Sequence, residues 1–167
     1  MYNKSELKHF LETLIGYDKD VEKEIDVSGA VIFKRGEQGE IIFLLIKRSE
    51  TDPGWPNQWE IPRGKCDKGP KEKIDSCLKR EVKEEVGVTI KVLSYLDKYT
   101  YVADKGTRRS TQYNFLCSLD PPEQEIKLSK EHSEYQWVTT IGETDLYINP
   151  RELRDTLELA IKRINEE

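Results

Sequence analysis

The chain has 167 residues, with 27 lysines and arginines against 32 aspartates and glutamates, so its formal net charge is −5. This length predicts one domain, and a composition that is 36% hydrophobic still allows a buried core. The acidic balance argues against broad nucleic-acid binding, which needs a basic face. No apolar run is long enough for a membrane span, and the first residues lack the sections of a signal peptide.

The first predicted element is an amphipathic helix. Apolar residues recur at helical spacing from Leu7 to Ile15, and Gly16 suits a C-cap. The charged residues that follow are predicted to form a loop. We therefore expect residues 1–24 to be an extension and residues 25–167 to be the domain itself.

Strands are predicted next. Residues 25–33 are rich in Val and Ile and residues 41–46 are largely apolar, with a turn at residues 36–39 between them. Proline, glycine and asparagine in residues 50–58 predict a long loop. Residues 59–61 are expected to form a short extended segment.

A helix is predicted to begin at Gly69 and Pro70, because glycine is acceptable at the N-cap and proline suits the first helical position. Gly87 is expected to end it. Its buried stripe is predicted to comprise Ile74, Cys77 or Leu78, Val82 and Val86.

The remaining elements are mostly strands. One or two strands are predicted in residues 88–101, and a hairpin turn at residues 104–107 leads to a return strand at residues 110–119. A short strand is predicted at residues 135–138, and residues 149–152 (Asn-Pro-Arg-Glu) begin a capped C-terminal helix. The apolar face of this helix comprises Leu153, Leu157, Ala160, Ile161 and Ile164. Strands before, between and after two long helices predict an α/β fold with a mixed sheet between helices.

The central helix carries a face of carboxylates. Glu81, Glu84 and Glu85 stand at i, i+3 and i+4, and this spacing stacks them on one side. Because like charges repel, such a face needs a cation, and oxygen ligands suit Mg²⁺ or Mn²⁺ rather than zinc. Just upstream, residues 59–65 (Trp-Glu-Ile-Pro-Arg-Gly-Lys) run from a strand end into a basic loop. A phosphate substrate, bridged by metal to the carboxylates, is the ligand expected between this helix face and the basic loop.

This segment resembles the Nudix box, whose pattern is Gly, five residues, Glu, seven residues, and Arg-Glu-apolar-x-Glu-Glu-x-Gly-apolar. Here Glu72 is followed after seven residues by Arg80, and residues 81–88 match the rest. The departure is that seven residues, rather than five, separate Gly64 from Glu72. The alternative is a solvated charged helix face. The resemblance implies an α/β/α sandwich with a mixed sheet, preceded here by the extra N-terminal helix.

The resemblance also implies a hydrolase that cleaves a pyrophosphate bond in a nucleoside diphosphate joined to another group. Divalent ions neutralise the phosphates and lower the pKa of the attacking water. By motif position, the implied metal ligands are Gly64, Glu81, Glu84 and Glu85, with Glu84 or Glu85 as an alternative base. The implied ion is Mg²⁺, with Mn²⁺ as the alternative.

Basic residues of the motif are expected to support this site. Arg80 is expected to hold Glu72 in an ion pair that braces the loop against the helix. Its alternative is a surface pair with Glu84, worth only about 0.2–0.5 kcal/mol. Arg63 and Lys65 are expected to face the phosphates.

Residues 99–138 resemble asymmetric diadenosine tetraphosphate hydrolases. The shared features are a tyrosine before a basic turn and a Ser-x-Glu-His-x-x-Tyr-x-Trp segment at residues 129–137. The resemblance implies that Tyr101 and Lys105 contact the base or phosphates, and that Glu131 binds metal or acts as the base. The alternative for Tyr101 is packing in the core, as aromatic residues in strands usually do.

The predicted function is therefore metal-dependent hydrolysis of a dinucleoside polyphosphate such as diadenosine tetraphosphate. Other enzymatic candidates are hydrolysis of nucleoside triphosphates (modified ones included), ADP-ribose or nucleotide sugars, and removal of phosphates or a cap from RNA ends. The alternative from another class is a nucleotide-sensing Nudix domain. The expected partner is a small nucleotide, with no membrane, and the protein is expected to be a monomer or homodimer.

Three cysteines, Cys66, Cys77 and Cys117, show neither metal-ligand spacing nor a paired framework. They are expected to be small buried or half-buried residues in a reducing environment, which predicts a cytoplasmic protein. Cys66, in the loop beside the predicted site, is the one to watch for oxidation.

Overall fold

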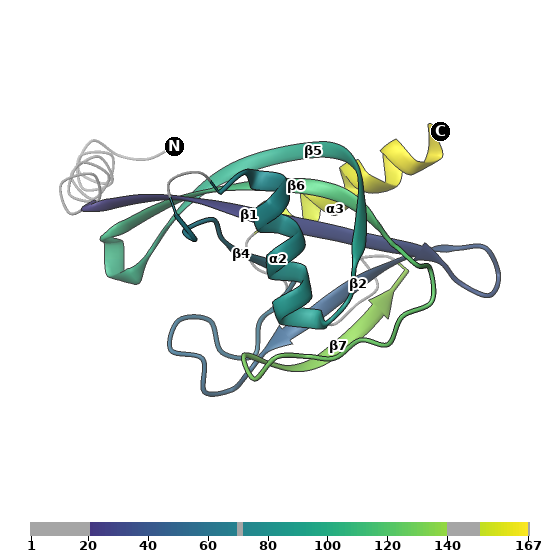
Figure 1. Cartoon of the computed structure of the whole chain (residues 1–167), viewed down its shortest axis with the longest axis horizontal. Helices are drawn as coiled ribbons and strands as arrows, with labels where there is room; N and C mark the ends of the chain where they lie inside the picture. Colours follow the sequence, from purple (N-terminus) through teal and green to yellow (C-terminus); the bar gives the residue numbers. More distant parts are fainter. Residues whose placement is uncertain (1–20, 70–71, 140–150, 167) are drawn as a thin grey trace, which may run out of the picture.

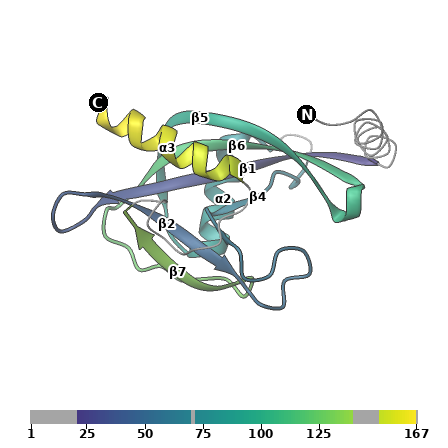
Figure 2. The same cartoon turned by 180° about the vertical axis from the view of Figure 1, so that it is seen from behind.

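The computed structural model describes residues 21–69, 72–139 and 151–166. One sheet lies between two helices: α2 (Ile74–Val86) covers one face, as Figure 1 shows, and α3 (Arg151–Asn165) covers the other, as Figure 2 shows. The predicted α/β/α sandwich is confirmed. The predicted N-terminal helix and the predicted cap at Asn149 and Pro150 lie outside the described residues.

The sheet is mixed, and its strands follow the order β3-β2-β1-β6-β5, with β4 paired to β1 and β7 paired to β2. The strands are β1 (Lys23–Arg35), β2 (Ile41–Arg48), β3 (Trp59–Glu60), β4 (Arg63–Lys65), β5 (Ile90–Ala103), β6 (Arg108–Leu119) and β7 (His132–Val138). Strands β1 and β6 pair in parallel, from Lys23 opposite Arg108 to Phe33 opposite Ser118. The other pairings between described strands are antiparallel.

The central strands alternate between two cores because successive side chains of a strand point to opposite faces. In β1, Val31 packs in the cluster under α3, whereas Ala30 and Ile32 pack in the cluster under α2. Strand β2 repeats this alternation, with Phe43 and Leu45 on one side and Leu44 and Ile46 on the other. The apolar runs predicted as strands are therefore central strands buried on both faces.

Helix α2 begins later than predicted. Its N-cap is Lys73 and its first residue is Ile74, so the prediction that it starts at Gly69 and Pro70 was wrong. Gly69 has a φ of +108°, which is not the extended backbone typical of an N-cap, and the chain does not enter the helix there. The end is as predicted, because Gly87 adopts the left-handed conformation with a φ of 75°.

The buried stripe of α2 comprises Cys77, Leu78, Val82, Glu85 and Val86. Ile74, predicted to belong to it, is only partly buried. A buried glutamate on an otherwise apolar face is unusual, and this residue faces the site described below. Within the described ranges, every helix is too short or too polar to span a bilayer.

Candidate active site

A cleft of about 640 Å³ is bounded by α2, β4, the β2–β3 loop (residues 49–58) and the segment before β7. The sequence-predicted residues that line it are Arg63, Gly64, Lys65, Arg80, Glu81, Glu84, Glu85, Tyr101 and Glu131. Glu72 and Lys105 do not line it. Lys105 lies in the short 3-10 turn η1 (Asp104–Gly106), and Arg108 at the start of β6 lines the cleft instead.

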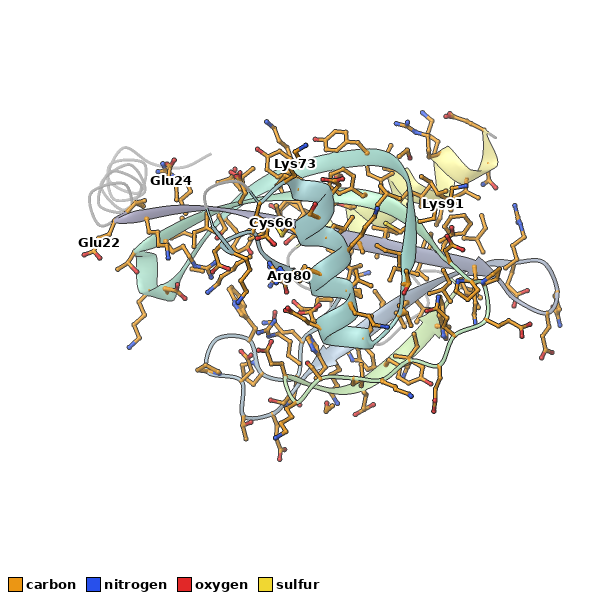
Figure 3. All side chains as sticks on the ribbon, viewed as in Figure 1. Glu22, Glu24, Cys66, Lys73, Arg80 and Lys91 are labelled. Carbon is orange, nitrogen blue, oxygen red and sulfur yellow. A yellow bond between two sulfur atoms is a disulfide. The ribbon has the colours of Figure 1, made fainter. Side chains whose placement is uncertain are left out.

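Arg80 links α2 to the loop between β4 and α2, and Figure 3 shows it on the side of α2 that faces β4. Its Nε donates to Glu72 Oε1 at 2.7 Å, and its Nη2 donates to the Lys65 carbonyl at 3.0 Å. Its Nη1 donates to Glu81 and, at 3.1 Å, to Glu84 Oε2. The expected ion pair with Glu72 and its alternative with Glu84 are therefore both present.

Gly64 lies directly against Glu81. A Cβ atom added at Gly64 would stand 1.9 Å from the Glu81 carboxyl carbon, closer than any real contact allows. In the sheet, Gly64 pairs with Ser28 of β1, so its backbone cannot easily move away. The position therefore has to be glycine for the Glu81 carboxylate to stay where it is.

Replacing Gly64 by alanine is expected to displace Glu81 and lower kcat by about 100-fold, since about 1 Å of misplacement has effects of that size. Steady-state kinetics and circular dichroism would measure this loss in a folded protein. Gly39→Asn is the control: nothing lies within 4 Å of a Cβ there, and asparagine tolerates its positive φ. Unchanged kcat in the Gly64→Ala protein would contradict the placement.

Two of the three carboxylates are sheltered from solvent. Burial raises the pKa of Glu85 well above its usual range, and the neighbouring charge of Glu60 adds to this effect. Burial also raises the pKa of Glu81. Glu85 Oε2 accepts a hydrogen bond from the Arg63 backbone N–H at 2.8 Å.

This donor set fits a divalent cation, because buried carboxylates of like charge are stabilised by one and hard oxygen ligands suit Mg²⁺ or Mn²⁺. In the described part of the chain, no three acidic, His or Cys side chains already converge as a metal cluster. Glu81 and Glu84 are instead turned onto Arg80. Both would have to leave this guanidinium to share one ion.

A buried ionic network, missed by the sequence reasoning, underlies the cleft. Glu60 accepts hydrogen bonds from Arg48 Nη1 at 2.7 Å and from Arg63 Nε at 2.8 Å, and it lies 3.1 Å from His132 Nε2. Burial alone would raise the pKa of Glu60, but the charge of Arg63, the hydrogen bond from His132 and the charge of Arg48 lower it to about 2. Glu60 is thus a buried anion that organises three cationic or polar groups.

The side chain of Arg63 is held within the protein. Besides Glu60, its Nη1 donates to the Tyr101 hydroxyl at 2.6 Å and to Gln112 Oε1 at 3.1 Å. Its guanidinium lies 5.3 Å from the centre of the Tyr101 ring. Tyr101 is half-buried and lines the cleft, so it combines packing with an accessible surface.

Three exposed lysines in the cleft make no ion pair with any described residue: Lys65 of β4, Lys68 in the loop after it and Lys130 before β7. The cleft's arginines, by contrast, are engaged by carboxylates: Arg48, Arg63, Arg80 and Arg108. These three lysines are therefore the positive charges most available to an anionic ligand. Sequence reasoning placed Lys65 at the site but gave no signal for Lys130, one of several lysines in a polar segment.

The expectation that the cysteines are unpaired was wrong for two of them. Cys66 and Cys77 form a disulfide, with Cα atoms 5.3 Å apart. Strand β4 pairs with β1 and α2 packs beside it, so the residue after β4 meets the first turn of α2; Figure 3 shows Cys66 beside this helix. Cys117 is free and buried, and burial raises the pKa of its thiol to about 12.

Reduction of this disulfide is expected to lower the free energy of unfolding by about 3 kcal/mol, the chain-entropy value for a closed loop of about this length. Thermal unfolding with and without a thiol reductant would measure the change. A Cys66→Ser protein is the control, because its melting temperature should not respond to reductant. A native protein that melts equally in both conditions would refute the bond.

A model of the NUDIX domain family matches residues 26–152. The nucleoside triphosphatase NudI of Escherichia coli (strain K12) is 28% identical over 109 residues, which cover 60% of this chain and 75% of that protein. The crystal structure of the MutT protein from Methanosarcina mazei Go1 is 30% identical with a TM-score of 0.67, covering 88% of this chain and 99% of that one. The structure of a C. elegans Ap4A hydrolase in a binary complex matches with a TM-score of 0.71 and 23% sequence identity. The match covers 86% of this chain and 99% of that chain. The chain therefore belongs to the Nudix family of pyrophosphohydrolases.

Proposed function

We propose that this chain uses Mg²⁺ to hydrolyse a pyrophosphate bond in a dinucleoside polyphosphate, with diadenosine tetraphosphate as the first candidate. The observation that carries the proposal is one cleft with carboxylates on α2 and three lysines, Lys65, Lys68 and Lys130, that form no ion pair with any described residue. Tyr101 and Glu131, the residues implied by the resemblance to diadenosine tetraphosphate hydrolases, line the same cleft. The C. elegans structure is an Ap4A hydrolase, but at 23% identity it supports only the fold.

The carboxylates of Glu81, Glu84 and Glu85 and the carbonyl of Gly64 would hold the divalent ion. When bound, the ion neutralises charge on the phosphates and lowers the pKa of the attacking water. The protein's own contribution is then positioning and electrostatics, which do most of the work in phosphoryl transfer.

Lys65, Lys68 and Lys130 would draw the polyphosphate into the cleft. Arg80 would keep the loop after β4 and α2 in register through Glu72. Glu131, an exposed carboxylate of the segment before β7, would accept the proton of the attacking water, with Glu84 or Glu85 as the alternative base. The water oxygen forms a bond to phosphorus while the bond to the bridging oxygen breaks. The nucleotide on that bridging oxygen leaves as an anion.

Nucleoside triphosphates are the second candidate substrate. The observation that favours them is the 28% identity to the E. coli nucleoside triphosphatase NudI, which is higher than the identity to the Ap4A hydrolase. The cleft chemistry serves both substrates, because each presents a chain of phosphates ending in a nucleoside.

Product analysis in Mg²⁺ tests the proposal. The panel comprises diadenosine tetraphosphate, nucleoside triphosphates, oxidised dGTP, ADP-ribose, nucleotide sugars and triphosphorylated RNA. ATP plus AMP from the first substrate, at rates well above the others, would support it. In water labelled with ¹⁸O, the labelled product identifies which phosphorus is attacked. Preferred release of pyrophosphate from triphosphates would move the function to the second candidate, and inactivity with Mn²⁺ as well would refute both.

A further inference from the structure

The β2–β3 loop brings a tryptophan to the cleft that the hydrolytic chemistry does not use. Trp55 lines the same cleft as Glu81, Glu84 and Glu85, and it is partly exposed. The chain's two other tryptophans are accounted for by packing. Trp59 is 4% exposed in the core, and the Trp137 ring lies 4.2 Å from the Lys34 ammonium.

The turn that carries Trp55 is fixed by Asp52. One oxygen of this carboxylate, Oδ1, accepts the backbone N–H groups of Gly54 at 2.9 Å and Trp55 at 2.7 Å. The other, Oδ2, accepts Arg48 Nε at 2.9 Å and Arg48 Nη2 at 2.8 Å. Arg48 in turn is bound to the buried Glu60. The turn is therefore tied to the ionic network beneath the cleft.

The backbone of Trp55 is also engaged on its other side. Its carbonyl accepts the N–H of Gln58 at 3.4 Å, and Arg48 donates its own N–H to the Gln58 carbonyl at 2.9 Å. Both polar backbone groups of Trp55 are thus hydrogen-bonded before any ligand arrives. A preorganised aromatic surface loses little conformational freedom on binding, so its contact energy is retained as affinity.

We propose that Trp55 is the stacking surface for a nucleobase of the substrate, and that Asp52 is the positioning residue that presents it. This inference deepens the proposed function and rests on it for the substrate class. Every base offers a flat π-face, so stacking on Trp55 favours nucleotides over base-free phosphates without selecting one base. The carboxylates and lysines of the cleft then bind the phosphates, and the tryptophan binds the nucleoside end.

Titration calorimetry with a matched pair of non-hydrolysable ligands tests this division. The first ligand is the α,β-methylene analogue of ADP, and the second is methylenediphosphonate, which has the same bridged phosphorus atoms but no nucleoside. Trp55→Ala is expected to weaken binding of the first about 10- to 100-fold, the range for loss of one base stack. Binding of the second is expected to stay within about twofold, since no stack is lost.

Three further variants extend the calorimetric test. Trp55→Phe should retain most of the nucleotide affinity, because it keeps an aromatic face. Asp52→Asn should weaken binding of the nucleotide analogue but not of the diphosphonate. The loss should be smaller than in Trp55→Ala, because the Trp55 ring remains while the carboxylate that fixes its turn is lost. Trp137→Phe, a substitution outside the cleft, should leave the affinity for both ligands unchanged.

The inference would be overturned if Trp55→Ala weakened the binding of both ligands equally, or changed the binding of neither. Failure of the native protein to bind the nucleotide analogue would overturn it as well. Failure of the proposed function looks different: the native protein would bind the analogue through Trp55 yet hydrolyse no member of the substrate panel.

Discussion

Replacing Glu84 or Glu85 by glutamine is expected to lower kcat by about 10²–10³-fold, the usual effect of removing one preorganised electrostatic group from an active site. Glutamine keeps the size of the side chain and one acceptor oxygen. The bond from the Arg63 N–H to residue 85 can therefore persist, and the fold should survive. Loss of a negative ligand should also raise the Mg²⁺ concentration that gives half-maximal rate.

Steady-state kinetics across a Mg²⁺ titration measure both effects, and thermal unfolding checks the fold. Glu158→Gln is the matched control, since Glu158 is also a helical glutamate but is exposed on α3, outside the cleft. Near-normal turnover in either α2 variant, on a substrate that the native protein hydrolyses, would remove that residue from the set of metal ligands and bases.

Replacing Glu60 by glutamine is expected to lower the free energy of unfolding by about 3–5 kcal/mol, because it leaves buried positive charge without its partner. Arg48 and Arg63 would both lose their ion pair to Glu60. Urea denaturation at neutral pH would measure the loss. Glu134→Gln is the control, because it breaks the pair with Lys47, in which the Glu134 side chain is 52% exposed, and should cost at most about 1 kcal/mol.

The stability that Glu60 contributes should depend on pH in one direction. Its pKa is lowered from 4.5 to about 2 in the folded protein, so the contribution is complete above about pH 4.5. It is lost as the pH falls through the folded pKa near 2. The difference in unfolding free energy between the native and Glu60→Gln proteins should therefore shrink as the pH is lowered from 5 to 2. A difference that stays constant over this interval would show that Glu60 is not a buried anion.

Local patterns predicted the parts of the fold and site that depend on neighbours in sequence. Apolar runs gave the central strands, and the left-handed Gly87 ended α2 where the sequence predicted. The spacing of Glu81, Glu84 and Glu85 sufficed to bring them to one cleft, because helix geometry alone sets which residues share a face.

Features that depend on distant partners escaped prediction. Glu60 is bound by Arg48, 12 residues away, and by His132, 72 residues away, and no spacing rule links such residues. The Cys66–Cys77 bond required β4 and α2 to be placed side by side. The late start of α2 follows from the backbone at Gly69, where a positive φ outweighs the capping preference read from residue type.

The parallel pairing of β1 with β6 also sets the order in which the protein can fold during synthesis. Glu24 of β1 and Arg109 of β6 form an ion pair across 85 residues of chain. At about 5–20 residues per second, β1 would leave the ribosome roughly 4–17 s before its neighbour. The loop of Gly64 and helix α2 are made within this interval, so they emerge before the sheet that orients them is complete. A nascent chain that stops before β6 would carry Glu81, Glu84 and Glu85 without the strands that complete the sheet beneath α2.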